Sequence, residues 1–189
     1  MRRLFRIDDS RICARMLIRF LCLSVLSVLL AAPQARAQNQ PPKKPAAPAS
    51  APKSIGKFDD WTAATHQESG QTVCYAFVRG QTTTPNRGVA VLTVTQRTAG
   101  RDAVAMAAPS AFPANASVTV QVDQAGLEFY TSGTNAFARD GKAVVAAFNK
   151  GSRAIARSPG MKNESVTDTF SLKGFSAAYA AIVKACPPK

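Results

Sequence analysis

The chain has 189 residues, of which 24 are Lys or Arg, 11 are Asp or Glu and one is His, so its formal charge is +13. This length fits one domain with appendages, and a hydrophobic content of 46% excludes wholesale disorder. Four cysteines are too few for a disulfide-dense miniprotein, and a single histidine excludes any site that needs two imidazoles.

Residues 1–37 have the three parts of a secretory signal peptide. Six arginines fall in the first 19 residues, the next 13 residues carry no charge, and Ala35-Arg36-Ala37 fits an A-x-A cleavage site. Cleavage is therefore expected after Ala37. An uncleaved membrane anchor is the alternative, but the uncharged segment is shorter than the roughly 20 residues that a spanning helix needs.

Export follows from this segment, whether translation starts at Met1 or at Met16. We expect the processed chain to lie in the periplasm or to associate with the envelope, and secretion from the cell is an alternative. No transmembrane segment is expected after cleavage, because the uncharged segment leaves with the signal peptide.

Cleavage also reduces the number of cysteines and the net charge. Loss of residues 1–37 removes seven arginines and two aspartates, which leaves 17 basic and nine acidic residues and a net charge of +8. Cys13 and Cys22 leave too, so Cys74 and Cys186 remain. In an oxidising compartment a lone pair of thiols most simply forms a disulfide. Two separate thiols are the alternative, but catalysis by them lacks a C-x-x-C spacing.

A linker is predicted next, followed by one domain. Residues 38–54 hold five prolines, three lysines and no large apolar residue, so they predict an extended tether. A single β-rich domain is predicted over residues 55–189. It has 14 basic and nine acidic residues, a net charge of +5.

Period-two patterns dominate this domain and predict strands. In Ser117–Asp123 three valines fall on one face and polar residues on the other, as in a half-buried strand. A turn at Asp123–Gly126 would return the chain antiparallel over Leu127–Thr131. Thr72–Val78 is apolar on both faces, as a central strand would be. Further strands are predicted at Phe58–Thr65, Val89–Gln96 and Ser165–Phe170.

Two segments have helical patterns instead. Asp140 is a candidate N-cap and Gly151 a candidate stop for a helix between them. Ser171 is a candidate cap for a C-terminal helix whose apolar residues recur at helical spacing from Phe175 to Val183. The predicted fold class is therefore mainly β, an antiparallel sheet or sandwich, with two helices, one of them at the C-terminus.

The sequence offers no catalytic, metal-binding or cofactor-binding set. His66 is the single imidazole and lies in the polar stretch Thr65–Gly70, which predicts a hairpin loop. A secreted hydrolase using His66 is an alternative, but no G-x-S-x-G motif supports it. No metal-ligand spacing and no phosphate-binding glycine motif is present, so we expect no cofactor.

Basic residues in the domain are spread singly. No basic run is interleaved with aromatic residues, so nucleic acid is not an expected partner. A dispersed cationic face fits either plain solubility or attraction to phosphate-rich glycolipids or acidic host glycans. The dispersed residues are Arg79, Arg87, Arg97, Arg101, Arg139, Arg153, Arg157 and Lys162.

Four parts of the domain form a recognisable set: Asp60-Trp61, Val73–Ala76, Thr167–Ala178 and the final Cys186. Together they resemble the invasion-associated locus B family of exported Gram-negative proteins. The similarity is to a short, two-cysteine branch, because Thr65 stands where the longer members have a cysteine. The resemblance implies an exported domain, and for some members a link to invasion of host cells.

These observations predict an exported, non-enzymatic envelope protein that binds a partner. The expected partner is an envelope component or a host surface, and no oligomeric state is specified. Lys173 is a candidate contact residue, since its neighbours Ser171, Leu172 and Gly174 have structural roles available. The alternatives are a structural envelope protein and the hydrolase that uses His66.

Overall fold

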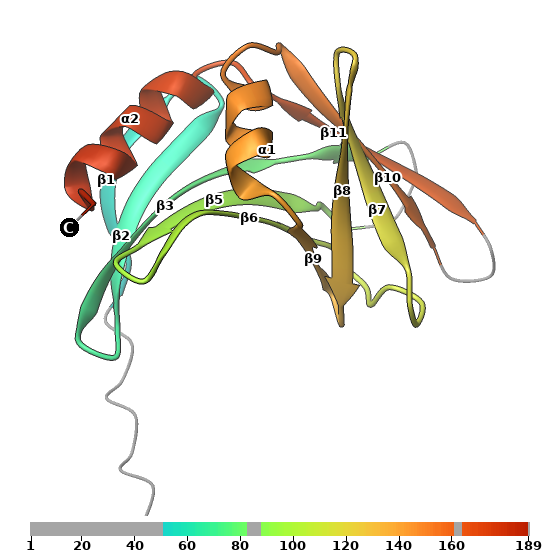
Figure 1. The fold of residues 1–189 in the computed structure, drawn as a ribbon, viewed down its shortest axis with the longest axis horizontal. Coiled ribbons are helices and arrows are strands. Elements are labelled where there is room, and N and C mark those ends of the chain that lie inside the picture. The colour runs from blue at the N-terminus through green and yellow to red at the C-terminus, as the bar shows by residue number, and fades with distance from the viewer. Residues whose placement is uncertain (1–50, 83–87, 161–163, 189) are drawn as a thin grey trace, which may run out of the picture. The chain divides into compact units, whose positions relative to one another are not determined.

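The computed structural model describes residues 51–82, 88–160 and 164–188 (Figure 1). The predicted signal peptide, its cleavage site at Ala37 and all but the end of the predicted linker lie outside these residues. None of the helices in the described part is long and apolar enough to cross a membrane. The elements are β1 (Lys53–Phe58), β2 (Trp61–Glu68), β3 (Gln71–Arg79), β4 (Gln81–Thr82), β5 (Val91–Arg97), β6 (Gly100–Ala107), β7 (Ser117–Val122), β8 (Ala125–Ser132), β9 (Asn135–Ala138), α1 (Gly141–Phe148), β10 (Arg153–Pro159), β11 (Ser165–Ser171) and α2 (Phe175–Ala185).

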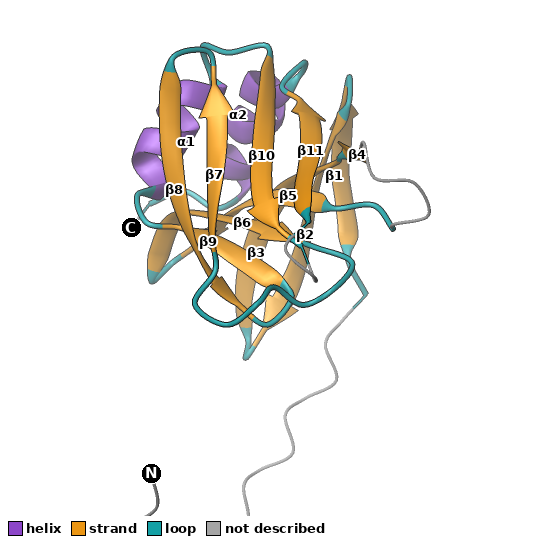
Figure 2. Ribbon diagram, turned by 90° about the vertical axis from the view of Figure 1, so that its right-hand side faces the viewer, coloured by secondary structure: helices purple, strands orange, loops and turns teal. Residues whose placement is uncertain are grey.

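The strands form one antiparallel sheet in the order β1-β2-β3-β5-β6-β9-β8-β7-β10-β11-β4. β4 follows β3 after the single residue Gly80, yet it pairs with β11 at the other end of this order. The stretch from β3 to β4 therefore connects the third strand of this order with its last strand, and the sheet bends back on itself. Figure 2 shows β8, β7, β10 and β11 side by side with the helices behind them.

Both helices lie on the same side of the curved sheet, where they cover its apolar face (Figure 1). Phe175 of α2 packs edge-to-face on Trp61 of β2, with ring centroids 4.9 Å apart, and on Phe148 of α1, at 5.3 Å. All three rings are buried. Because large aromatic rings bury the most apolar area per residue, this cluster anchors both helices to the sheet.

The predicted fold class is confirmed. Ser117–Val122 and Ala125–Ser132 form the predicted hairpin, and β3 is internal, between β2 and β5. Asp140 caps α1 as expected, because its Oδ1 accepts a hydrogen bond from the Ala143 amide at 3.0 Å.

The structure differs from the predictions around the first two strands. The segment predicted as one strand from Phe58 to Thr65 is divided by a turn at Asp59, whose φ of 49° reverses the chain between β1 and β2. β1 also begins at Lys53, inside the segment predicted as linker, because its backbone pairs with β2. His66 lies in β2 and not in a hairpin loop. The turn comes later, at Ser69.

The start of α2 also differs from the prediction. Gly174, not Ser171, is the N-cap, and its φ of +86° lies in the left-handed region that favours glycine. The Ser171 hydroxyl instead accepts a hydrogen bond from the Lys173 amide at 3.2 Å, and so stabilises the turn before the helix.

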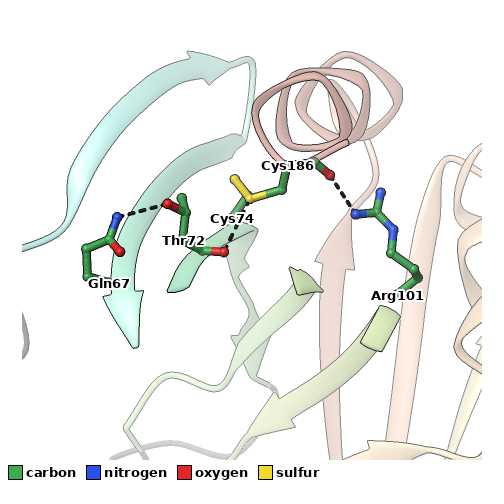
Figure 3. The surroundings of a disulfide bond; sticks show 5 residues. All are labelled: Gln67, Thr72, Cys74, Arg101 and Cys186. Atoms are coloured by element: carbon green, nitrogen blue, oxygen red, sulfur yellow. Dashed lines mark hydrogen bonds between the residues drawn. A yellow bond between two sulfur atoms is a disulfide. The ribbon is translucent and has the colours of Figure 1, made fainter. Parts of the chain in front are cut away.

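The end of α2 is fixed to the sheet by a Cys74–Cys186 disulfide, the pairing that the sequence predicts (Figure 3). Cys74 lies in β3, and Cys186 follows α2 directly. Arg101 Nη1 donates a hydrogen bond to the Cys186 carbonyl oxygen at 2.6 Å. The helix end is therefore held by one covalent link to β3 and by one polar contact to β6.

Candidate functional site

His66, the single imidazole, packs against another ring. Its ring meets Tyr75 edge-to-face with centroids 5.4 Å apart. Within the described part of the chain, His66 makes no hydrogen bond to a serine, threonine or carboxylate. Among the same residues, no three His, Cys, Asp or Glu side chains are grouped so as to hold a metal ion.

A polar cleft of about 470 Å³ lies where the sheet bends back on itself. Its lining comes from both ends of the strand order, namely β1, β2 and β3 on one side and β4, β10 and β11 on the other. The cleft is therefore a product of the closure of the sheet.

The strand register builds the first wall of this cleft. Lys57 of β1 pairs with Thr62 of β2, and Thr62 pairs in turn with Phe77 of β3. Arg79 lies two residues beyond Phe77, and hence on the same face of β3. Thr62 and Phe77 are half-buried, whereas Lys57 and Arg79 are exposed. This wall therefore has an aromatic ring and a hydroxyl between two cations.

The second wall is built in the same way. Gln81 of β4 pairs with Thr169 of β11, and Arg153 of β10 pairs with Ser171 of β11. Thr169 and Ser171 are half-buried, and Arg153 is exposed. The wall therefore presents two hydroxyls and an amide beside a third cation.

Three contacts hold the two walls together. Trp61 Nε1 donates a hydrogen bond to the Ser171 carbonyl oxygen at 2.9 Å, and the Asp60 amide donates one to the Lys173 carbonyl oxygen at 3.4 Å. Gly174 packs so closely on the Phe58 carbonyl that an added Cβ would collide with it. Two of these contacts join backbone groups, and the third joins the buried Trp61 indole to a backbone carbonyl, so the separation of the walls is set by the fold.

The charge of the cleft is positive. Lys57, Arg79 and Arg153 face one carboxylate, Asp60. None of these four side chains has an ion pair with a described residue. Lys173, the contact residue predicted from the sequence, lies next to the cleft but does not line it. Its Nζ pairs with Asp59 at 3.2 Å, and 73% of its side chain is exposed.

Residues 61–183 match the family model described as invasion associated locus B (IalB) protein. The chain belongs to the IalB family. Among solved structures, it is similar to the crystal structure of invasion associated protein B from Bartonella henselae, with a TM-score of 0.56 and 21% sequence identity. That similarity covers 72% of this chain and 97% of the other, and it shows a shared fold. A comparison with curated proteins finds no match.

The resemblance to the IalB family that the sequence predicts is thus confirmed, and one of the segments that carry it, Thr167–Ala178, reaches the cleft. Thr169 and Ser171 of that segment line the second wall, whereas Phe170 and Leu172, which alternate with them, are buried in the core. Lys57 was missed in the sequence. Arg79 and Arg153 were recognised as dispersed cations, but nothing in the sequence brought them together.

A second polar cluster in this IalB family member joins the β5–β6 hairpin to α2. Asp102 Oδ1 accepts hydrogen bonds from Gln96 Nε2 at 2.6 Å and from the Tyr179 hydroxyl at 2.7 Å. Burial, reinforced by the hydrogen bond to Asp102, raises the pKa of Tyr179 to about 12. The phenol therefore stays protonated as a donor at neutral pH, and the cluster serves as a structural clamp.

Proposed function

We propose that this IalB family member is exported, is cleaved after Ala37 and acts in the periplasm or envelope as a non-enzymatic binding module. The observation that carries the proposal is the basic cleft, whose walls are held at a fixed separation and whose three cations have no ion-pair partner among the described residues. Such a site binds a partner without first rearranging, and so avoids part of the ordering cost of binding.

Two features support export. The N-terminal segment has the basic region, apolar stretch and A-x-A site of a signal peptide. The Cys74–Cys186 disulfide fits an oxidising compartment, because disulfides persist outside the cytoplasm and are rare inside it.

The partner is proposed to be an envelope component or a host surface. Membership of the IalB family supports the second of these, as does similarity to a protein described as invasion associated. A role without chemistry is supported by His66, whose ring packs on Tyr75 and has no hydrogen-bonded nucleophile in the described part of the chain.

Site-specific photo-crosslinking in intact cells tests the proposal. A photoreactive residue at Gln81, which is exposed in the cleft, is compared with one at Gln124, which is exposed in the β7–β8 turn away from it. We expect a discrete crosslinked species from position 81 in the periplasmic or envelope fraction, and none from position 124. Equal crosslinking from both positions, or a protein found uncleaved in the cytoplasm, would contradict the proposal.

A second assay tests the absence of catalysis. Purified wild-type protein and the His66→Ala variant are incubated with ester, peptide and glycan substrates. We expect no turnover that depends on His66. Hydrolysis lost in the His66→Ala variant, while its folding is unchanged, would establish the hydrolase alternative.

A further inference from the structure

We infer that the ligand of the basic cleft is an anionic carbohydrate, a sugar carrying phosphate or carboxylate groups. The inference rests on the proposed function, because it specifies what the same cleft binds. It draws on four properties of the cleft: its charge, its volume, the chemistry of the lining between its cations and the pairing of the strands that form its walls.

The positive charge of the cleft favours an anionic ligand. Lys57, Arg79 and Arg153 come from three different strands, and the closure of the sheet brings them around one space that holds the single carboxylate of Asp60. Like charges that converge without partners repel one another, and a bound anion relieves that repulsion. Two of the three are arginines, whose planar guanidinium groups bind phosphate or carboxylate through two parallel hydrogen bonds.

The volume of the cleft favours a ligand larger than a single inorganic ion. The cleft measures about 470 Å³, which is within the range of about 300–1,000 Å³ typical of small-molecule sites. An inorganic phosphate ion would leave most of this space filled with solvent, whereas a sugar with an acidic substituent would displace much more of it.

The lining between the cations suits a sugar ring. Thr62, Thr169 and Ser171 present hydroxyl groups, each of which both donates and accepts hydrogen bonds, and Gln81 adds an amide with both capacities. Sugar hydroxyls also both donate and accept hydrogen bonds, so they need a lining with donors and acceptors. Phe77, half-buried in the same wall, offers an apolar face to the C–H groups of the ring.

The free edges of the sheet contribute little to the cleft, which disfavours an extended peptide. Peptides commonly bind a sheet by adding a strand to a free edge. The two end strands of the order, β1 and β4, both reach the cleft, but β4 has only two residues and β1 brings only Lys57 to the lining. Most of the lining comes from side chains of the internal strands β2, β3, β10 and β11, so side chains dominate recognition of the ligand.

Calorimetric titration of the purified processed chain tests the inference. The probes are lipopolysaccharide, an acidic oligosaccharide without lipid (oligogalacturonate), a neutral dextran oligosaccharide, poly-glutamate and inorganic phosphate. We expect binding to one or both acidic glycans, weaker at high salt, and none to dextran. Binding of oligogalacturonate identifies the glycan as sufficient, whereas binding of lipopolysaccharide alone identifies a lipid-linked source.

Matched variants locate the binding site. Arg153 and Arg157 are both exposed arginines of β10, but only Arg153 lines the cleft. We expect Arg153→Gln and Arg79→Gln each to weaken glycan binding about tenfold, the loss of one charge-assisted contact. Arg157→Gln should change it less than twofold. Unchanged thermal melting of all three variants confirms that folding is intact.

Several results would overturn the inference. The first is an equal loss of glycan binding in Arg157→Gln and Arg153→Gln. The others are tighter binding of poly-glutamate than of either glycan, and binding of phosphate as tight as that of the glycans. If no probe binds while position 81 still crosslinks to a partner in cells, the inference fails and the proposed function stands. If position 81 captures nothing either, both fail.

Discussion

Removing the Cys74–Cys186 disulfide measures how much of the stability depends on a single crosslink. The informative variant is a double variant that carries both Cys74→Ala and Cys186→Ala. Both positions are buried, so alanine leaves no hydroxyl to desolvate, whereas serine would. The double variant thus isolates the crosslink from the cost of an unpaired polar group.

The magnitude follows from the span of the bridge. The two cysteines are 112 positions apart, and the chain-entropy model gives about 4.8 kcal/mol at 25 °C for a loop of that length. The native state should change little. α2 remains docked through the buried residues Phe175, Ala178 and Ile182, and Arg101 still binds the backbone carbonyl at position 186. The loss therefore arises mainly in the unfolded chain.

Urea unfolding provides the assay. With an m-value of about 2 kcal/mol per molar urea, the midpoint of the double variant should fall by about 2 M. Trp61 is the only tryptophan and is fully buried, so its fluorescence reports the transition. Reductant should lower the midpoint of the wild-type protein toward that of the variant and leave the variant unaffected.

One result would refute this reasoning. If the oxidised wild-type protein and the double variant differ by less than about 1 kcal/mol, the crosslink does not restrict the unfolded chain as the model requires.

Three further predictions concern other contacts of the fold. Gly174→Ala combines a left-handed φ with a collision against the Phe58 carbonyl, and should destabilise the protein by about 3 kcal/mol in urea unfolding. Because the pKa of Tyr179 rises from 10.0 to about 12 on folding, the stability contributed by its neutral phenol is complete below pH 10 and is lost between pH 10 and 12. Tyr179→Phe should flatten that part of the stability–pH curve. Arg97→Ala breaks an ion pair with Glu68 at 2.9 Å, but both side chains are about half exposed, so the urea midpoint should stay close to that of wild type.

Each of these predictions has its own control or contrary outcome. Gly100→Ala is the match for Gly174→Ala, because an added Cβ there meets no atom within 4 Å, and it should leave the urea midpoint nearly unchanged. For Tyr179→Phe, a loss of stability as steep as that of wild type between pH 10 and 12 would exclude the phenol as its source. A clear fall in the urea midpoint of Arg97→Ala would show that this surface pair contributes to the stability of the fold.

Some strands could be predicted from their large apolar residues, whereas β10, whose buried residues are small, could not. β7 was predicted because three valines alternate with polar residues. β10 has the same alternation, but its buried side chains are Ala154, Ala156 and Ser158, which give almost no hydrophobic signal. Its place beside β7 and β11 makes it a strand, and that neighbourhood is tertiary information.

The cleft could not be predicted for a related reason. Its cations at positions 57, 79 and 153 are far apart in the chain, and they meet because β4, a strand of two residues, joins β3 to β11. A pairing that short has no sequence period to detect. The disulfide, in contrast, could be predicted from a cysteine count, because removal of the signal peptide leaves one pair.

The Thr167–Ala178 segment, one of the four that resemble the IalB family, has two separable roles, because its first part belongs to β11 and alternates between two faces. Phe170 and Leu172 are buried on the inner face, while Thr169 and Ser171 line the cleft on the outer face. Substitutions on the inner face should lower stability, and substitutions of the outer side chains should alter binding at nearly constant stability. Ser171 is a partial exception, since its hydroxyl also accepts the Lys173 amide hydrogen bond in the turn before α2. Its carbonyl accepts the Trp61 hydrogen bond, and because that carbonyl belongs to the backbone, the contact survives a change of the Ser171 side chain and the wall it fixes stays in place.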